Sequence, residues 1–194
     1  MLREVFLTMP AGMPANAYMI HEMVYTAMLG PKGDGHRAFL FSFEPEMGGV
    51  VTIRSECLPA PFLAASMPVR IPAAGAVAPF RLVASPTGRA DDQHGRKRKD
   101  GRVRTRAVAL PAGDKAARIS WLAQKAVRSG FELVETPDVV SAGIPFERQG
   151  VSFRQERCVF TGSLKVLDYD RFVLAMTKGI GRARALGFGL LTTY

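Results

Sequence analysis

Three side chains that could transfer protons or hold a ligand lie close together near the N-terminus. Tyr18, His21 and Tyr25 are spaced at i, i+3 and i+7, so a helix that turns about 100° per residue places them on one side. An imidazole has an ordinary pKa of about 6.5, which suits it to accept or donate a proton near neutral pH. The apolar stripe of the same segment centres on Ile20 and Met23. His21 therefore lies on the shoulder of the helix, either as a proton-transfer group or as an ordinary surface histidine.

The second unusual segment is the glycine-rich tail, residues 179–189. Its glycines are Gly179, Gly181, Gly187 and Gly189, and Arg182 and Arg184 lie between them. The tail follows a predicted helix and precedes a predicted strand, which is not the order of a dinucleotide-binding fingerprint, and it has no Lys-Ser or Lys-Thr pair of a P-loop. Glycines permit close backbone approach, and the two arginines suit an anion such as a phosphate backbone. The alternative is a helix end followed by a tight connection to a strand.

The distribution of charge favours a polyanionic partner. The 194 residues carry 26 basic and 17 acidic side chains, a net charge of +9. Residues 1–87 are neutral, so the whole surplus follows residue 87. Such a surface releases counterions when it binds nucleic acid, although simple solubility is the alternative explanation. Cys57 and Cys158 show no CxxC spacing, and no apolar run is long enough to cross a membrane. We expect a cytoplasmic protein with no cofactor and no metal.

The elements that must position these residues repeat in the same order in both halves. In the first half we expect a strand over 2–8, a helix from an Asn16 cap to Gly30, a hairpin over 37–44 and 50–56, a short helix over 62–67, and a closing strand over 77–85. In the second we expect a strand over 102–110, a helix over 114–129, a strand over 131–135, one long strand or a hairpin over 151–167, a helix from an Asp168 cap to Lys178, and a last strand over 190–194.

This order predicts an α+β fold of two tandem ferredoxin-like (βαββαβ) domains with antiparallel sheets. The domains would be residues 1–87, which carry the helix with His21, and residues 102–194, which carry the glycine-rich tail. The segment 88–101 contains Arg89, Arg96 and Lys97, and we expect it to be a basic linker between them.

Four ordered motifs resemble one family. The tail 179–191 resembles the C-terminal signature of the CRISPR-associated repeat endoribonucleases, in particular the CasE family that serves the Cascade complex. Segment 16–21, with a tyrosine three residues before a histidine, is similar to the family's early helix. Segment 80–86 is similar to its strand with an Asn-Pro corner, with Ser85 in place of the asparagine, and segment 117–122 is similar to its Ala-Trp-Leu helix.

The resemblance implies a metal-independent endoribonuclease that cleaves precursor CRISPR RNA at the base of the repeat hairpin and retains the product. With it, we expect His21 to be the general acid or base. Tyr18, one helical turn away, could hold the scissile phosphate or orient the nucleophile; the alternative is an aromatic ring that packs on the flank of the helix. RNA supplies its own 2′-OH nucleophile, so the expected ends are a 2′,3′-cyclic phosphate and a 5′-OH. It also implies the repeat stem-loop and other Cascade-type effector subunits as partners, and no membrane.

The RNA-binding side chains should come from the basic second half of the chain. The candidates are Arg182, Arg184, Lys178, Arg148, Arg154, Arg157, Arg89, Arg96 and Lys97. Guanidinium groups can contact phosphates or guanine edges, and phosphate contacts should dominate along an A-form stem. The family sometimes has a lysine five residues after the histidine, where this chain has Thr26. A non-cleaving RNA-binding subunit of a CRISPR effector complex is therefore the alternative function.

Overall fold

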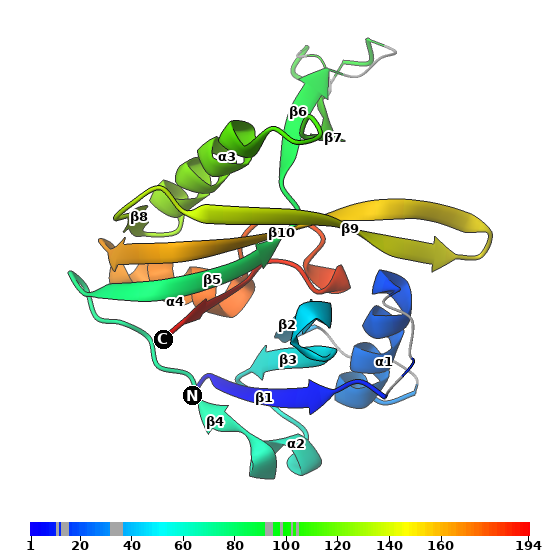
Figure 1. Ribbon diagram of the computed structural model, residues 1–194, viewed down its shortest axis with the longest axis vertical. Helices are drawn as coiled ribbons and strands as arrows, with labels where there is room; N and C mark the ends of the chain where they lie inside the picture. Colours follow the sequence, from blue (N-terminus) through cyan, green and yellow to red (C-terminus); the bar gives the residue numbers. More distant parts are fainter. Residues whose placement is uncertain are drawn as a thin grey trace.

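The computed structural model describes residues 1–10, 12, 16–31, 37–91, 95–97, 99–101, 103 and 105–194. Two antiparallel sheets face each other, with helices packed against their outer sides (Figure 1). The described residues include no helix that is long and apolar enough to cross a membrane.

The first sheet is formed by four strands in the order β2-β3-β1-β4, all of them antiparallel to their neighbours. The strands are β1 (Arg3–Thr8), β2 (Phe39–Glu44), β3 (Val50–Ser55) and β4 (Met67–Pro68), with α1 (Ala17–Leu29), the 3₁₀ turn η1 (Pro45–Met47) and α2 (Ala60–Ala65) between them. Alternate residues of β1, β2 and β3 form a core with Ile20 and Val24 of α1. The other face of this sheet is turned toward the second sheet.

Helix α1 begins and ends where the sequence predicts. The side chain of Asn16 caps it by accepting from the backbone N–H of Tyr18 at 2.9 Å, and Gly30 ends it at a φ of +77°. Burial of Ile20 and Val24 fixes the rotation of the helix. Tyr18 and His21 consequently lie along its partly exposed flank.

The second sheet has the order β11-β5-β10-β8, and β9 pairs with the first part of β10. Its strands are β5 (Val77–Ala84), β8 (Phe131–Leu133), β9 (Asp138–Arg148), β10 (Val151–Val166) and β11 (Leu190–Thr193), with α3 (Lys115–Arg128), α4 (Tyr169–Lys178) and the 3₁₀ turn η2 (Arg184–Leu186). Apolar residues of α3 and α4, such as Leu122, Phe172 and Met176, pack on one face of the sheet. The long β9–β10 hairpin extends beyond the sheet and runs past α1 (Figure 1).

Both sheets have the strand order of a ferredoxin-like unit, which confirms the predicted fold class. One strand of the first half is assigned to the wrong sheet, however. The strand predicted to close the first sheet, residues 77–85, is β5 and lies in the second sheet between β10 and β11. The first sheet is closed by the two-residue strand β4, which pairs with Arg3 and Glu4. The sheets therefore divide between Pro68 and Val77.

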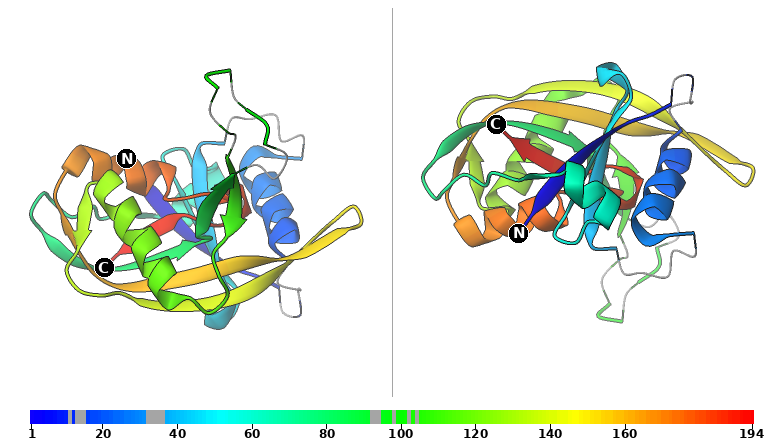
Figure 2. Two further views of the ribbon diagram at one scale, coloured as in Figure 1. Left: turned by 90° about the horizontal axis from the view of Figure 1, so that it is seen from above. Right: turned by 90° about the horizontal axis from the view of Figure 1, so that it is seen from below.

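The basic segment 88–101 does not separate the two sheets. Its first residues, up to Asp91, lie in β6 (Thr87–Asp91), which pairs with β7 (Thr105–Ala109) in a two-stranded ribbon between β5 and α3 of the second unit, and Lys97 pairs with Val103. The strand predicted over 102–110 is thus β7, which pairs with β6 and not with the main sheet; residues 102 and 104 lie outside the described part. The ribbon projects from the body of the molecule (Figure 2).

Buried ion pairs join the facing sides of the two units. Arg54 of β3 is 2% exposed, bonds to Glu4 at 2.5 Å and donates from Nη1 to the carbonyl of Met176 at 3.0 Å. Glu44 at the end of β2 is paired with Arg81 of β5 and Arg157 of β10. A charge taken out of water needs such partners, so these contacts fix how the units face each other.

Candidate functional site

The imidazole of His21 faces the glycine-rich tail. Its Nδ1 lies 2.7 Å from the carbonyl oxygen of Ala185 in η2. A carbonyl oxygen can only accept a hydrogen bond, so Nδ1 carries the hydrogen. Nε2 is therefore the atom that gains or loses a proton. The side chain is 19% exposed, which leaves this ring partly open to solvent.

Two tyrosines flank the imidazole on α1. The ring of Tyr25 is tilted against His21 at a centroid distance of 4.0 Å, and it packs in turn on Phe39. Tyr18 is stacked at 5.7 Å and inclined by 28°. The i, i+3, i+7 spacing thus produces a continuous row of rings, as the sequence predicts.

Charged groups of opposite sign stand beside Tyr18. The carboxylate of Glu22 lies 3.5 Å from Nε2 of His21, and the guanidinium carbon of Arg148 lies 4.8 Å from the centroid of the Tyr18 ring. The neighbouring Glu22 carboxylate, together with some desolvation, raises the pKa of Tyr18, while Arg148 opposes that rise. The Tyr18 hydroxyl is therefore protonated at neutral pH and can donate a hydrogen bond.

The tip of the β9–β10 hairpin brings Arg148 to this site. Phe146 meets the edge of Tyr18 at 5.8 Å and stacks on Phe153 of the opposite strand at 4.5 Å. The backbone N–H of Glu147 also approaches the Asn16 side chain at 3.4 Å. An aromatic contact and a backbone contact thus hold the hairpin tip against the start of α1.

The glycines of the tail are required by packing within the protein. A Cβ on Gly187 would lie 2.8 Å from the ring of Phe41, and the residue has a φ of +84°. A Cβ on Gly189 would lie 2.7 Å from the carbonyl oxygen of Ile180, and one on Gly181 would lie 3.0 Å from the Trp121 ring. A side chain is therefore excluded at these positions because the tail backbone packs closely against β2, against α3 and against other residues of the tail. This packing places Ala185 beside His21.

The cations of the tail lie in different environments. Arg182 and Lys178 are exposed, whereas Arg184 is half-buried and donates to the carbonyl of Lys178 at 2.6 Å. Arg184 thus helps to close the loop that begins at Gly179. Of the predicted tail cations, Arg182 and Lys178 are the two that face solvent.

Arg182 and Arg89 come together in a basic pocket. A cavity of about 160 Å³ is bounded by Gly181, Arg182, Trp121, Lys125 and the start of β6, including Arg89. Burial and the charges of Arg128 and Arg89 lower the pKa of Lys125. No carboxylate from the described residues lines this cavity, so the cations repel one another until an anion enters. Arg96 and Lys97 are exposed on the projecting ribbon.

The remaining two candidates on β10 differ from each other. Arg154 is exposed and donates across the hairpin to the carbonyl of Gly143 at 2.5 Å. Arg157 is 4% exposed and pairs with Glu44 at 2.6 Å and Glu46 at 2.9 Å. The prediction that Arg157 is an RNA-binding side chain is wrong for this structure, because its guanidinium is buried between the two units.

Several residues around these sites are not among those predicted from the sequence. Glu22 follows Tyr18 by four residues, a spacing that places the two side chains side by side on a helix, so the pattern could have identified it. Lys125 is four residues after Trp121, and its ammonium lies 5.6 Å from the indole centroid. The carbonyl of Ala185 has no signal in the sequence, because any residue type could supply it.

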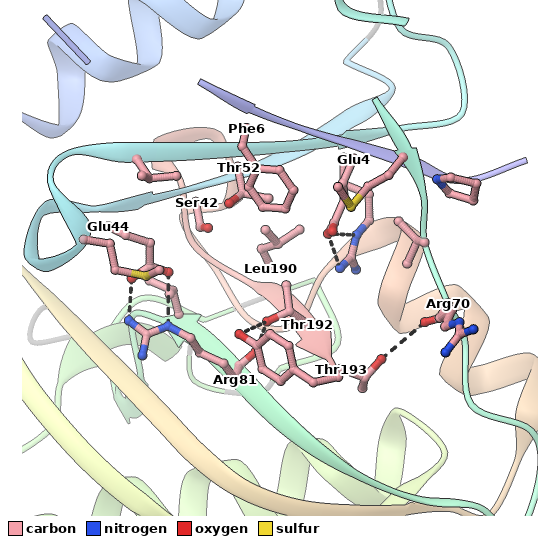
Figure 3. A pocket seen from close by; sticks show the side chains of 18 residues that line it. Glu4, Phe6, Ser42, Glu44, Thr52, Arg70, Arg81, Leu190, Thr192 and Thr193 are labelled. Atoms are coloured by element: carbon pink, nitrogen blue, oxygen red, sulfur yellow. Dashed lines mark hydrogen bonds and ion pairs between the residues drawn. The ribbon is translucent and has the colours of Figure 1, made fainter. Parts of the chain in front are cut away.

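A separate pocket of about 340 Å³ lies between the facing sheets, away from the row of rings. It is lined by residues of both sheets, among them Phe6, Glu44 and Arg81 (Figure 3). Tyr194 also lines it. The guanidinium of Arg81 donates to the carboxylate of Glu44 in this pocket, and the hydroxyl of Thr192 lies 3.4 Å from that of Tyr194. Neither Tyr18 nor His21 lines this pocket.

Solved structures share this architecture over the whole chain. A CRISPR endoribonuclease Cse3 bound to a 19-nucleotide RNA is 22% identical, with a TM-score of 0.71. The match covers 100% of this chain and 98% of that chain. The CRISPR-associated protein Cas6e of Escherichia coli str. K-12 is 24% identical, with a TM-score of 0.70 and the same coverage. Thermus thermophilus Cse3, bound to an RNA that represents a pre-cleavage complex, is 21% identical, with a TM-score of 0.71 and the same coverage.

These likenesses establish the fold. No curated protein sequence matches the chain at a significant level. A family model described as "CRISPR associated protein" matches residues 10–193, a span that includes α1, the β9–β10 hairpin and the glycine-rich tail. On that match, the chain belongs to the CRISPR-associated protein family.

Proposed function

We propose that this protein is a metal-independent endoribonuclease that cleaves precursor CRISPR RNA at the base of the repeat hairpin. It leaves a 2′,3′-cyclic phosphate and a 5′-OH and retains the cleaved product. One observation carries the proposal: Nδ1 of His21 is held by the Ala185 carbonyl, and Nε2 is left as the atom that exchanges a proton. The resemblance in fold to endoribonucleases bound to RNA supports it.

The chemistry requires two proton movements. The 2′-oxygen loses its proton and forms a bond to phosphorus, and the bond from phosphorus to the 5′-oxygen breaks as that oxygen gains a proton. With Nε2 unprotonated, His21 serves as the base, and with Nε2 protonated it serves as the acid. The protonated hydroxyl of Tyr18, on the same flank of α1, can orient the 2′-OH or donate to the scissile phosphate.

The RNA would reach this site along the basic side of the second unit. Arg182 adjoins the tail turn that contacts His21, and Arg182 shares the basic pocket with Arg89 and Lys125. Lys178, Arg96 and Lys97 add exposed positive charge. Phosphates of an A-form stem suit this arrangement, since shape and backbone contacts dominate recognition of double-stranded RNA.

The decisive experiment is cleavage of a labelled repeat hairpin in EDTA by the wild-type protein and by His21→Ala. We expect the wild type to cut and the variant to lose at least about a hundredfold in single-turnover rate, as removal of a general acid or base does. A substrate with a 2′-deoxy nucleotide before the cut should bind but remain intact. Product ends are identified by phosphatase sensitivity and mass.

The outcomes separate the two candidate functions. Tight binding without cleavage by either protein would overturn the endoribonuclease and leave a non-cleaving RNA-binding subunit, the alternative that Thr26 suggests. Cutting of the 2′-deoxy substrate would rule out the internal nucleophile. A structure similar in fold at a TM-score of 0.63 is described as a CRISPR RNA-guided surveillance complex, and we propose that subunits of such a complex are partners of this protein.

A further inference from the structure

The helix that carries the proposed catalytic groups supplies no positive charge. Between Ala17 and Leu29 there is no lysine or arginine, and the one carboxylate of the helix, Glu22, lies 3.5 Å from His21. A phosphate that becomes pentacoordinate carries extra negative charge on its non-bridging oxygens, which a nearby cation stabilises. That cation must therefore come from another element of the chain.

The β9–β10 hairpin presents such a cation at the right place. The guanidinium of Arg148 lies over the ring of Tyr18 at 4.8 Å, while Tyr18 is itself stacked beside His21 at 5.7 Å. Arg148 is exposed. Its backbone is held, because Phe146 packs on Tyr18 and the N–H of Glu147 reaches Asn16. The hairpin thus brings a solvent-facing cation to α1 on a backbone that contacts the start of that helix.

We propose that Arg148 is a further catalytic residue, whose guanidinium contacts the non-bridging oxygens of the scissile phosphate and stabilises the charge of the transition state. This inference rests on the proposed endoribonuclease function. Arg148 replaces the cation that α1 lacks, and its planar donors match the oxygens of a phosphate. Its contact with the Tyr18 ring orients the guanidinium in the absence of RNA.

Such a role differs from simple attraction of RNA. A cation that only attracts the backbone weakens binding when it is removed but leaves the rate of the bound complex unchanged. A cation that faces the charge of the transition state lowers the cleavage rate of fully bound RNA. Arg154 and Arg148 lie on the same hairpin, but Arg154 is turned to the carbonyl of Gly143.

The test compares Arg148→Gln, Arg148→Lys and a charge-matched control, Arg171→Gln, in EDTA with the labelled repeat hairpin. Arg171 is an exposed residue at the start of α4, paired with Asp168. For Arg148→Gln we expect the single-turnover rate at saturating protein to fall about a hundredfold, the effect of losing one preorganised donor. The dissociation constant should change by no more than about tenfold, as for one exposed charge. Arg148→Lys should restore part of the rate, and Arg171→Gln should match the wild type.

Sulfur substitution at the scissile phosphate gives a second readout. The wild type should be slowed more by one phosphorothioate diastereomer than by the other, and this preference should shrink in Arg148→Gln. If wild type cleaves and His21→Ala does not, but Arg148→Gln cuts bound RNA at the wild-type rate with unchanged stereochemical preference, the role of Arg148 is overturned and the endoribonuclease stands. Loss of wild-type cleavage itself would overturn the endoribonuclease instead.

Discussion

Two arginines of one hairpin, Arg148 and Arg157, illustrate how differently the same residue type is used. Arg148 is exposed at the tip, over the ring of Tyr18, whereas Arg157 is buried nine positions further along between Glu44 and Glu46. At the tip, the hairpin extends beyond the sheet and contacts the start of α1. Nearer its base, β10 is covered by the end of β2. The distance of an arginine from the hairpin tip therefore decides whether its guanidinium is exposed to solvent or buried in an ion pair.

The largest effect on stability should come from Arg157→Ala. It leaves Glu44 buried with one partner fewer, and loss of one member of a buried ion pair costs about 3 kcal/mol of unfolding free energy. Chemical denaturation of the wild type and the variant measures the difference. RNA affinity, measured where both proteins are folded, should change little because this guanidinium does not face solvent.

Arg154→Ala is the matched control, since Arg154 is an exposed arginine of the same strand with a single bond to a backbone carbonyl. Its loss should cost less than about 1 kcal/mol. Equal destabilisation by the two variants would contradict the difference between a buried and an exposed arginine of this hairpin. A large loss of RNA affinity in folded Arg157→Ala would contradict it as well.

Gly187→Ala should lower the free energy of unfolding by an intermediate amount. It also tests whether packing of the tail affects the site around His21. The new Cβ would approach the Phe41 ring and require a strained φ of +84°, at a cost of about 2 kcal/mol. Because Gly187 follows the turn that holds Ala185 beside His21, the cleavage rate of bound RNA should also fall. Wild-type cleavage by a folded but destabilised variant would show that the Ala185 contact is unimportant for catalysis.

Individual helices and strands can be predicted from the sequence more readily than which strands pair with each other. Helix α1 could be predicted because Asn16 and Gly30 mark its ends and the apolar spacing marks its buried face. The exchange of strands between the sheets could not, because β4 is two residues long and leaves Val77–Ala84 as the visible candidate to close the first sheet. Whether a strand joins one sheet or another depends on contacts that its own residues do not encode.

The candidate site also combines residues that local spacing predicts with partners that lie far away in the sequence. The row of Tyr18, His21 and Tyr25 follows from spacing within a helix, so it was accessible from the sequence. The partner of His21 is a backbone carbonyl 164 residues away, and the partners of Arg157 lie on β2 and η1, more than 100 residues away. Charge alone does not distinguish a solvated arginine from one paired with a buried acid, so the sequence wrongly predicts Arg157 as an RNA-binding side chain.

Glu46→Gln should have the smallest effect and tests the edge of the buried cluster. Burial raises the pKa of Glu46, but its own backbone N–H, its neighbour Glu44 and the charge of Arg157 outweigh burial, so the net pKa is lower than usual. A carboxylate with a lowered folded pKa stabilises the fold above its unfolded pKa of about 4.3, and this contribution disappears as pH falls through the folded value. The side chain is 44% exposed, so we expect a loss below about 1 kcal/mol at pH 7. Denaturation of both proteins across pH 3 to 7 should show the difference closing as the pH falls below the unfolded pKa; a difference that grows in acid would mean that the folded pKa of Glu46 is raised and not lowered.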